Sequence, residues 1–486
     1  MASFEEIRKV RIEKLNKLLS KGLNPYPAKT DKEYSLNEVI EKFDELSKKK
    51  SLTLAGRVLA IRGQGALVFI NISDGTALFQ GLLKKDEMKA EDFDLFVETA
   101  DLGDFIEITG NLFITKKGQQ TLQISTWKIL TKSLRPLPDK WDGLQDEEER
   151  LRKRYLDVMF NPEVKDLIIK RTKFWNAFRE FLNLKGFIEV ETPILENTTG
   201  GAEAKPFITH HNALGLDVYL RISPELWLKR LMVAGFPKVF EIGRIFRNEG
   251  MDAEHLQDYT QMECYQAYSN YEEGMKFVEE MYKFVAEKTF NTLKFKIKNF
   301  DIDLEKKWEV YDYTEMIKKM TGVDITKSDL KTIEKKLQEL KVDYDKKDGF
   351  NLNRGIDNLW KYCRKQIAGP GFLINVPVMM EPLAKRMESN PNLVERFQVI
   401  LAGSEMGKGF SELNDPLDQM ERFKEQAKLR EEGDLEAQMT DNEFVEALEY
   451  GMPPSFGFGL SERLFSFLAN KPLRDCQIFP LLRPKK

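Results

Sequence analysis

Five apolar, strand-like segments lie between residues 51 and 132, and this pattern constrains the N-terminal part of the chain more than any other feature. Three segments precede a charged, helix-like stretch over residues 84–99, and two follow it. The five segments cover residues 51–61, 66–73, 76–83, 104–115 and 119–129. Glycines and an Asp-Gly pair separate the first three, as expected for turns. Three strands, a helix and two strands is the order of an OB barrel, whose open face commonly binds single-stranded nucleic acid.

Three side chains of this region are candidates for contact with nucleic acid on that face: Arg62, Phe69 and Gln80. An exposed aromatic ring can stack on a base, while arginine and glutamine supply hydrogen-bond donors. The pattern is equally compatible with Phe69 in the barrel core. We therefore predict an OB-fold domain over residues 51–134 that binds nucleic acid, with the position of Phe69 left open.

A basic segment precedes the barrel within residues 1–50. Residues 8–21 carry six basic side chains against one acid, Glu13, and apolar residues recur at helical spacing. This pattern predicts a basic amphipathic helix. A solvated helix that packs its apolar face is the simpler interpretation, and contact with nucleic acid is the alternative.

The C-terminal part of the chain predicts a second, larger domain over residues 161–486, joined through a proline-containing and charged hinge over 135–160. Helical stretches cover residues 163–185, 225–235, 271–289, 327–340 and 415–431. Short apolar strands cover residues 238–246, 257–268, 371–378, 396–404 and 455–460. Helices and strands do not alternate strictly, which favours an α+β fold with a mostly antiparallel sheet. The lysine-rich segment 324–366 is predicted to be helical and peripheral.

Composition excludes several classes of protein. The 486 residues are 42% hydrophobic and 32% charged with a net charge of −4, as in a highly charged globular protein. Three widely spaced cysteines argue against a disulfide scaffold or a cysteine zinc site and favour the cytoplasm. The chain contains neither an apolar signal core at its start nor an apolar run of about 18 residues, so no membrane span is expected.

The chain contains three histidines, which limits the possible mechanisms. We expect neither serine-hydrolase chemistry nor a multi-histidine metal site. Attack by a carboxylate on the α-phosphate of a nucleotide fits better, because the nucleophile is already ionised. Catalysis then reduces to alignment of the reactants and neutralisation of phosphate charge by arginine and Mg²⁺.

The segment from Arg247 to Glu263 collects the residue types that such a reaction needs. Arg247 supplies a fixed cation and Tyr259 a ring. Glu263 lies in an otherwise apolar run, so a cationic partner is expected because a buried unpaired carboxylate is costly. Glu225 follows Ser-Pro at a predicted helix start, where interaction with the helix dipole alone would also explain it.

Two glycine-containing segments complete the set. Glu405 and Glu412 flank a glycine-containing turn, and oxygen ligands of this kind suit Mg²⁺. Gly457 and Gly459 alternate along a predicted strand, so a ligand ring could lie against the backbone there, with Arg463 at the next helix start.

The ordered motifs resemble those of one family. Residues 186–193 (GFIEVETP), 246–263 (beginning FRNE) and 457–463 (GFGLSER) resemble motifs 1, 2 and 3 of class II aminoacyl-tRNA synthetases. Segments 200–202, 206–214, 221–226, 381–385 and 410–415 are similar to the lysine enzyme in particular. Over essentially its whole length, the chain resembles a bacterial class II lysyl-tRNA synthetase, a class IIb enzyme.

The resemblance implies a ligase that activates lysine with ATP and Mg²⁺ and transfers it to tRNA(Lys) in the cytoplasm, as a homodimer through the region from Gly186 to Pro193. Arg247, Glu405 and Arg463 would be catalytic. The implied lysine-binding residues are Gly201, Glu225, Arg247, Glu263, Tyr265, Phe410 and Glu412. The implied ATP-binding residues are Arg247, Glu249, His255, Tyr259, Glu405 and Arg463. Metal ligands would be Glu405, Glu412 and Gln398, and anticodon contacts Arg62, Phe69 and Gln80.

Two departures from the family pattern concern the predicted site. Gln398 stands where the family usually has a glutamate ligand of Mg²⁺, which leaves the number of metal ions open. Lys408 stands where the family often has asparagine, and its charge could oppose the substrate ammonium or pair with a carboxylate or phosphate. A catalytically altered paralogue that acts as an RNA-binding protein is the alternative. Paired Glu225 and Glu263 argue against an aspartate or asparagine ligase.

Overall fold

The chain forms two compact units, residues 1–150 and 151–486. The computed structural model describes residues 3–138, 144, 146–250, 254–344, 350–434 and 436–485. The division falls inside segment 135–160, for which the sequence predicts a hinge. Two short helices lie in this segment, α5 (Glu147–Arg152) and α6 (Arg154–Phe160). Each unit is described by itself.

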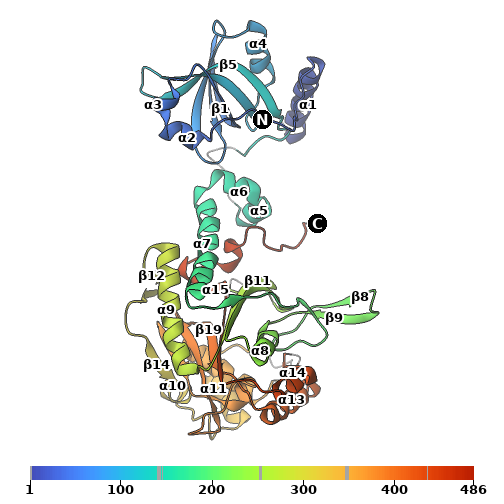
Figure 1. Ribbon diagram of the computed structural model, residues 1–486, viewed down its shortest axis with the longest axis vertical. Coiled ribbons are helices and arrows are strands. Elements are labelled where there is room, and N and C mark those ends of the chain that lie inside the picture. Colours follow the sequence, from blue (N-terminus) through green and yellow to red (C-terminus); the bar gives the residue numbers. More distant parts are fainter. Residues whose placement is uncertain are drawn as a thin grey trace. The chain divides into compact units, whose positions relative to one another are not determined.

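The smaller unit contains a closed barrel of strand order β1-β2-β3-β5-β4 (Figure 1), which confirms the predicted OB fold. Its strands are β1 (Leu52–Gln64), β2 (Leu67–Ser73), β3 (Leu78–Lys84), β4 (Phe105–Ile114) and β5 (Gln120–Thr131). Helix α4 (Ala90–Thr99) joins β3 to β4, and α2 (Leu36–Glu41) and α3 (Phe43–Leu46) precede the barrel. Alternation along β2 buries Val68, Ile70 and Ile72 in the interior.

The same alternation answers the question left open for Phe69. Phe69 lies between the buried Val68 and Ile70, so its ring faces the outside of the barrel, where it is half-buried. Arg62 lies directly opposite Phe69 across β1 and β2, and directly opposite residues share a face. Gln80 shares this outer face, since its partner on β2 is Asn71. The three predicted anticodon residues therefore line one outer surface of the barrel.

Helix α1 (Phe4–Ser20) is the predicted basic helix, and three of its basic side chains hold it on the barrel. Arg11 is buried and donates hydrogen bonds to the backbone carbonyls of Ser133 and Arg135. Lys14 pairs with Asp101 at 2.7 Å. Lys17 forms an ion pair with Glu98. For these three cations, the contacts agree with a helix that packs against its own domain. Any contact with nucleic acid would fall to Arg8, Lys9 and Lys21.

The larger unit is built on an eight-stranded sheet of order β14-β15-β18-β19-β20-β11-β10-β6. Its strands are β6 (Ile188–Glu189), β10 (Lys238–Phe246), β11 (Asp258–Ala267), β14 (Glu309–Asp312), β15 (Gly371–Ile374), β18 (Arg396–Leu401), β19 (Ser404–Ser411) and β20 (Ser455–Ser461). Neighbouring strands are antiparallel except β14 with β15 and β10 with β6. The predicted mostly antiparallel sheet is confirmed.

Helices cover both faces of this sheet. They are α7 (Pro162–Leu184), α8 (Glu225–Val233), α9 (Tyr271–Phe290), α10 (Tyr313–Thr321), α11 (Leu330–Glu339), α12 (Leu352–Arg364), α13 (Pro416–Glu431), α14 (Asn442–Glu449) and α15 (Arg463–Leu468). Smaller strands are β7 (Leu195–Glu196), β8 (Ile208–His211), β9 (Leu216–Leu220), β12 (Lys294–Ile297), β13 (Phe300–Asp303), β16 (Val376–Pro377) and β17 (Leu393–Val394). Two 3-10 turns are η1 (Val378–Met380) and η2 (Leu473–Cys476).

The helix ends follow local signals in the sequence. Asp415 caps α13 by accepting hydrogen bonds from the backbone of the first turn, and Pro416 occupies the first helical position. Asn270 caps α9 in the same way. That helix ends at Asn291, which adopts the left-handed conformation that closes many helices.

The two faces of the sheet differ in polarity. Met262 and Cys264 of β11 and Phe458 of β20 are buried on one face, where α7 and α9 cover them (Figure 1). The residues that alternate with them along the same strands face the other way and are polar or glycine. Polar residues in the middle of a sheet mark the face where a site is to be sought.

Segment 324–366 contributes more to the unit than the peripheral role predicted from its composition. Its helix α12 buries Leu359, Trp360 and Cys363 in the core on the polar side of the sheet. Arg354 and Asp357 of the same helix line the pocket described below. Described lysines of the segment, such as Lys331, Lys335 and Lys361, are exposed, so the composition of the whole segment does not reveal its buried apolar face.

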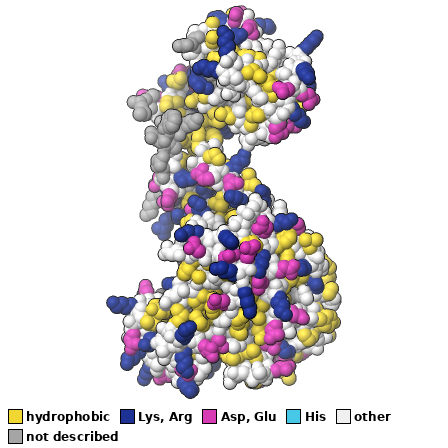
Figure 2. Space-filling model, turned by 90° about the vertical axis from the view of Figure 1, so that its left-hand side faces the viewer, with side chains coloured by type: hydrophobic (Ala, Val, Ile, Leu, Met, Phe, Trp, Pro, Cys, Tyr) yellow, Lys and Arg dark blue, Asp and Glu magenta, His cyan; other side chains and the backbone are white. Residues whose placement is uncertain are grey.

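The surface carries mixed charges and the cysteines form no disulfide, as the composition predicts. On the face seen in Figure 2, Lys and Arg side chains are interspersed with Asp and Glu across the larger unit. Cys264, Cys363 and Cys476 are buried, unpaired thiols. In the described ranges, no helix is both long and apolar enough to span a bilayer.

Candidate active site

A pocket lies on the polar face of the large sheet, and its floor consists of two rows of residues across four strands. Strand register places the members of each row directly opposite one another on β18, β19, β20 and β11, with their side chains on one face. The first row is Gln398, Lys408, Gly459 and Glu263. The second row is Arg396, Phe410, Gly457 and Tyr265.

The glycines in both rows keep the middle of the floor open. A Cβ atom on Gly457 would lie 2.0 Å from Oε1 of Glu412 and 2.5 Å from the Tyr265 ring. A Cβ atom on Gly459 would lie 3.2 Å from Cγ of Glu263. A flat ligand can therefore approach the backbone of β20 closely, as the alternating glycines predicted.

Three carboxylates, Glu225, Glu263 and Glu412, lie close together near one end of the pocket, and a buried lysine pairs with two of them. Nζ of Lys229 lies 2.7 Å from Oε1 of Glu225 and 2.5 Å from Oε2 of Glu412. Burial alone would lower the pKa of Lys229, but Glu225 and Glu412 outweigh it and the net pKa is raised. Burial raises the pKa of Glu412 well above its usual value despite Lys229. One ammonium thus faces more carboxylates than it can neutralise.

The third carboxylate of this group, Glu263, has neutral partners only. It accepts hydrogen bonds from Ser223 at 2.7 Å, from Gln261 at 2.5 Å and from the Tyr265 hydroxyl at 2.9 Å. Burial, and then the neighbouring Glu225, raise the pKa of Glu263 to about 7. A cation that entered beside Glu263 would find an oriented carboxylate without a charged partner among the described residues.

Arginine and tyrosine side chains line the pocket beside this cluster. Arg247 follows β10, and its guanidinium lies 5.7 Å from the centre of the Tyr259 ring. Its Nε is buried and has no hydrogen-bond partner in the described part of the chain. Arg463 begins α15, donates to the backbone carbonyl of Glu405 at 3.4 Å and pairs with Glu254. Two guanidinium groups therefore face the space over the glycine floor.

Glu405 is held in a strongly cationic setting. Its Oε1 accepts a hydrogen bond from the indole of Trp360 at 2.7 Å and lies 3.7 Å from Arg364. Burial would raise the pKa of Glu405, but Arg364 and Arg396 outweigh this effect and lower it. Glu405 is therefore ionised and available to the pocket.

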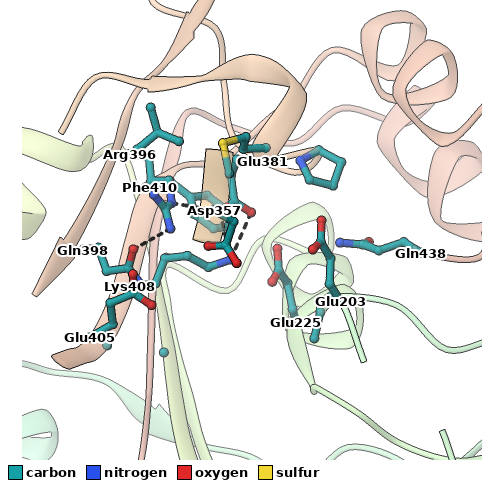
Figure 3. Close-up of a pocket in the computed structure, with 18 of the residues that line it drawn as sticks. Glu203, Glu225, Asp357, Glu381, Arg396, Gln398, Glu405, Lys408, Phe410 and Gln438 are labelled. Atoms are coloured by element: carbon teal, nitrogen blue, oxygen red, sulfur yellow. Dashed lines mark hydrogen bonds and ion pairs between the residues drawn. The ribbon is translucent and has the colours of Figure 1, made fainter. Parts of the chain in front are cut away.

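A second charge group lies on the opposite side of the floor from Glu263. Glu381 lies 2.9 Å from Arg396 and 2.9 Å from Nζ of Lys408, so two cations share one buried carboxylate. Arg396 also donates to Oε1 of Gln398 at 2.8 Å. Figure 3 shows the ammonium end of Lys408 directed at Glu381, with Gln398 and Glu405 on one side and Glu225 on the other.

Apart from the three residues on the barrel, the predicted site residues line the pocket except Glu412, which lies directly behind Gly457 of the floor, and Glu249 and His255. Gly201 lines the pocket with φ +82°, and a Cβ atom there would lie 2.7 Å from Cβ of Glu225. Glu249 and His255 lie exposed in the connection between β10 and β11 and are absent from the pocket lining. The predicted contacts of these two side chains with ATP stay predictions. Residues 251–253 between them lie outside the described residues.

Comparison with known proteins decides the family. Residues 146–483 match the model of class II tRNA synthetases (D, K and N), and residues 52–130 match an OB-fold nucleic acid binding domain. The chain belongs to the class II tRNA synthetase family. Like other members, the synthetase is expected to use ATP and typically Mg²⁺.

Three relatives of the synthetase, each similar over nearly its whole length, carry the same name. A lysine–tRNA ligase of Thermotoga maritima is 44% identical over 99% of this chain and 97% of that protein. A lysine–tRNA ligase of Carboxydothermus hydrogenoformans is 43% identical over 99% and 98%. One of Thermoanaerobacter pseudethanolicus is 42% identical over 99% and 96%.

The three residues expected to bind Mg²⁺, namely Glu405, Glu412 and Gln398, do not form a site in which one ion has several protein ligands. In the described ranges, no group of three or more His, Cys, Asp or Glu could hold a metal ion. Glu412 is occupied by Lys229, and Oε1 of Gln398 accepts from Arg396. Of the three predicted ligands, only Glu405 is left as a carboxylate that an ion brought in with ATP could reach. Mg²⁺ bound to phosphates needs few protein carboxylates.

Sequence reasoning missed Lys229, the cation at the centre of the carboxylate group. A signal for it exists, because Glu225 and Lys229 are four residues apart and share one face of α8. Glu412 comes from β19 and its following turn, about 180 residues along the chain, and no local pattern joins it to the pair. At the end of β20, Ser461 lines the pocket, whereas the next residue, Glu462, pairs with Arg171 of α7.

Proposed function

We propose that the synthetase is a lysine–tRNA ligase that forms lysyl-adenylate from lysine and ATP and transfers the lysyl group to tRNA(Lys). One observation carries the proposal: Glu225 and Glu412 share one buried cation, Lys229, while the neighbouring Glu263 accepts hydrogen bonds from neutral groups only. The side chain of a bound lysine would supply the missing positive charge. A neutral or acidic side chain would leave buried carboxylates uncompensated, which costs several kcal/mol.

The first half-reaction needs alignment more than proton transfer. A carboxylate oxygen of lysine attacks the α-phosphorus of ATP, the bond to the bridging oxygen breaks, and pyrophosphate leaves with the electron pair. Arg247 would bind the α-phosphate and the attacking carboxylate, with its buried Nε as a free donor. Tyr259 and Arg463 would enclose the adenine over the glycine floor. Mg²⁺ would arrive with ATP and meet Glu405.

In the second half-reaction, a hydroxyl of the tRNA 3′ end attacks the carbonyl carbon of the adenylate and AMP leaves. Arg62, Phe69 and Gln80, on one outer surface of the barrel, would contact the anticodon. Stacking of a base on Phe69 and hydrogen bonds from the other two side chains would provide recognition.

We further propose that the synthetase acts in the cytoplasm as a homodimer. Strand β6 lies at one edge of the sheet, within the segment from Gly186 to Pro193. Ile188 is 48% exposed there, and the nearby Leu195 is also 48% exposed. Apolar side chains beside an open strand edge suit an interface with a second copy.

Amino-acid-dependent exchange of pyrophosphate into ATP tests the proposed activity. We expect exchange with lysine and little with arginine, aspartate or asparagine. Arg247→Ala should lower the exchange rate at least a hundredfold, by loss of a phosphate donor. Arg244→Ala is the matched control, because Arg244 lies on the same hairpin, pairs with Asp258 and is outside the pocket lining.

Two results would count against the proposal. Exchange supported by another amino acid instead of lysine would show that the carboxylate group reads a different substrate. Absence of exchange with any amino acid, together with retained tRNA binding, would favour a catalytically altered RNA-binding paralogue.

A further inference from the structure

Lys408 is the one lysine among the described residues that line the pocket. Its side chain is 38% exposed, and Nζ lies 2.9 Å and 3.1 Å from the two oxygens of Glu381. Its ammonium lies 5.8 Å from the centre of the Phe410 ring, and Lys229 lies 5.3 Å from the same ring. A second ammonium thus borders the space proposed for the substrate.

The backbone of β19 explains why Lys408 and Glu405 both line the pocket. Two residues three positions apart on a regular strand would face opposite sides of the sheet. Here Gly407 has φ +125°, and the pairing of β18 with β19 shifts register between Gln398 and Ile400. A Cβ atom on Gly407 would lie 2.7 Å from the Phe458 ring, so the irregularity requires glycine.

This irregularity places Lys408 between two functional ends. Glu405, next to Arg463, marks the end proposed for the nucleotide. Phe410 and Glu412 follow along the same chain segment and mark the end proposed for the lysine side chain. In the floor, Gly459 alone separates Lys408 from Glu263. Lys408 therefore borders the point where the carboxylate of the amino acid meets the α-phosphate of ATP.

The charge balance leaves Lys408 free to exchange partners. Glu381 is shared by Lys408 and Arg396, and Arg396 lies 2.9 Å from it. If Lys408 turned toward an anion in the pocket, Glu381 would keep one guanidinium partner and would not become an unpaired buried charge. The neutral amide of Gln398 lies directly opposite Lys408 and does not compete for the ammonium.

We propose that Lys408 binds the reacting anions of the adenylation step and takes the place of a metal ion at the Gln398 side of the pocket. This inference rests on the proposed adenylation activity. During the step, the carboxylate oxygen bonds to the α-phosphorus and pyrophosphate leaves with the electron pair. No proton moves in this step, and the ammonium of Lys408 stabilises the negative charge on the non-bridging oxygens of the pentacoordinate phosphorus. The metal that the reaction needs is then the ion carried by ATP.

Substitution of Lys408 tests its catalytic part. Lys408→Met should lower kcat of lysine-dependent pyrophosphate exchange about a hundredfold, as for loss of one oxyanion donor, with a smaller change in KM for ATP. Lys408→Arg should retain activity within about tenfold of the wild type, because it keeps the charge. Lys294→Met, at a 69% exposed lysine on β12, is the control. A kcat of Lys408→Met within threefold of the wild type would overturn the proposal.

The number of metal ions bound per active site tests whether Lys408 replaces one of them, and this measurement does not depend on enzymatic activity. Mn²⁺ is titrated by electron paramagnetic resonance into the synthetase with saturating α,β-methylene-ATP. We expect one tightly bound ion per active site in the wild type and two in the double variant Lys408→Asn, Gln398→Glu. Two or more ions in the wild type, or one in the double variant, would overturn the replacement.

The two experiments keep failure of this inference apart from failure of the proposed function. The metal count involves only the nucleotide analogue and holds whichever amino acid is activated. If another amino acid supported pyrophosphate exchange by the wild type, lysine would be the wrong substrate. Lys408→Met and Lys408→Arg could then still be compared with that amino acid. Far-ultraviolet circular dichroism and the thermal midpoint of each variant confirm that it is folded.

Discussion

Lys229 is the residue on which the carboxylate group depends. Its side chain is fully buried between Glu225 and Glu412, so Lys229→Met would leave two carboxylates without a cation. We expect the free energy of unfolding to fall by about 3–5 kcal/mol, measured by urea denaturation at neutral pH. Lys283→Met is the matched control: Lys283 also pairs with a glutamate four residues earlier, Glu279, but that pair is partly exposed.

The control variant should lose less than about 1 kcal/mol, as exposed pairs usually do. Equal losses in the two variants would mean that the carboxylates near Lys229 are neutral in the folded protein and need no cation.

Glu263 is the residue that should make lysine binding depend on pH. Its pKa is raised to about 7, so free synthetase holds a proton there below that pH. An entering ammonium favours the ionised carboxylate, lowers this pKa and drives proton release. Affinity for lysine should therefore rise between about pH 6 and pH 8 and level off above. Calorimetric titrations of lysine in phosphate and Tris buffers at pH 7 should show net release of protons.

Glu263→Gln should abolish this release, because the amide does not titrate. Lysine binding without proton exchange in the wild type would show that Glu263 is already ionised in the free protein.

Among the elements, strand β20 controls the shape of the pocket, because Gly457 and Gly459 have no side chains to fill it. Gly457→Ala would place a methyl group 2.0 Å from Oε1 of Glu412 and 2.5 Å from the Tyr265 ring. Both side chains would have to move, and a displacement of about 1 Å can cost a hundredfold in activity. We expect KM for lysine to rise and kcat to fall in pyrophosphate exchange. Gly63→Ala in β1, whose added methyl group would lie in ordinary contact with Val68 at 3.4 Å and the backbone oxygen of Leu67 at 3.7 Å, should be neutral.

The sequence predicts the elements of the fold better than the partners within the site. Alternation of apolar residues with polar residues or glycine marks β11 and β20, and caps such as Asn270 and Asp415 mark helix starts. These signals are local. The ion pair of Lys229 with Glu412, and the indole of Trp360 on Glu405, join segments that are far apart in the chain. Only the packing of the whole unit brings such partners together.

The same limit explains the two departures at Gln398 and Lys408. The sequence shows that both residues depart from the family pattern, but it does not show which side chains they contact. Glu381 lies in a turn between η1 and β17, and strand register, together with the bend at Gly407, decides which side of the sheet Lys408 faces. A shift of one residue in β19 would turn this ammonium into the core.

Because the molecule consists of two compact units, recognition of tRNA by the barrel should be separable from adenylation in the larger unit. Phe69→Ala and Arg62→Ala should lower kcat/KM for charging of tRNA(Lys) by about tenfold to a hundredfold, the worth of one stacked base. Lysine-dependent pyrophosphate exchange should not change, because both residues belong to the barrel unit. Ile114→Ala, at a 58% exposed position elsewhere on the barrel, is the control.

Loss of exchange in Phe69→Ala would show instead that the barrel supports the catalytic unit directly. Unchanged charging in both variants would place the anticodon on another surface.

The three buried cysteines have a practical consequence for measurements on the whole molecule. Burial raises the pKa of Cys363 to about 11 and of Cys476 to about 12, and it raises the pKa of Cys264 still further. Thiols of this kind react slowly with maleimides. A cysteine placed at Tyr450, which is 80% exposed, and another at Ile114 would then be the only sites that take up dye in the folded chain. Energy transfer between two such dyes would follow the distance between the barrel and the larger unit as tRNA binds, with all three native thiols kept in place.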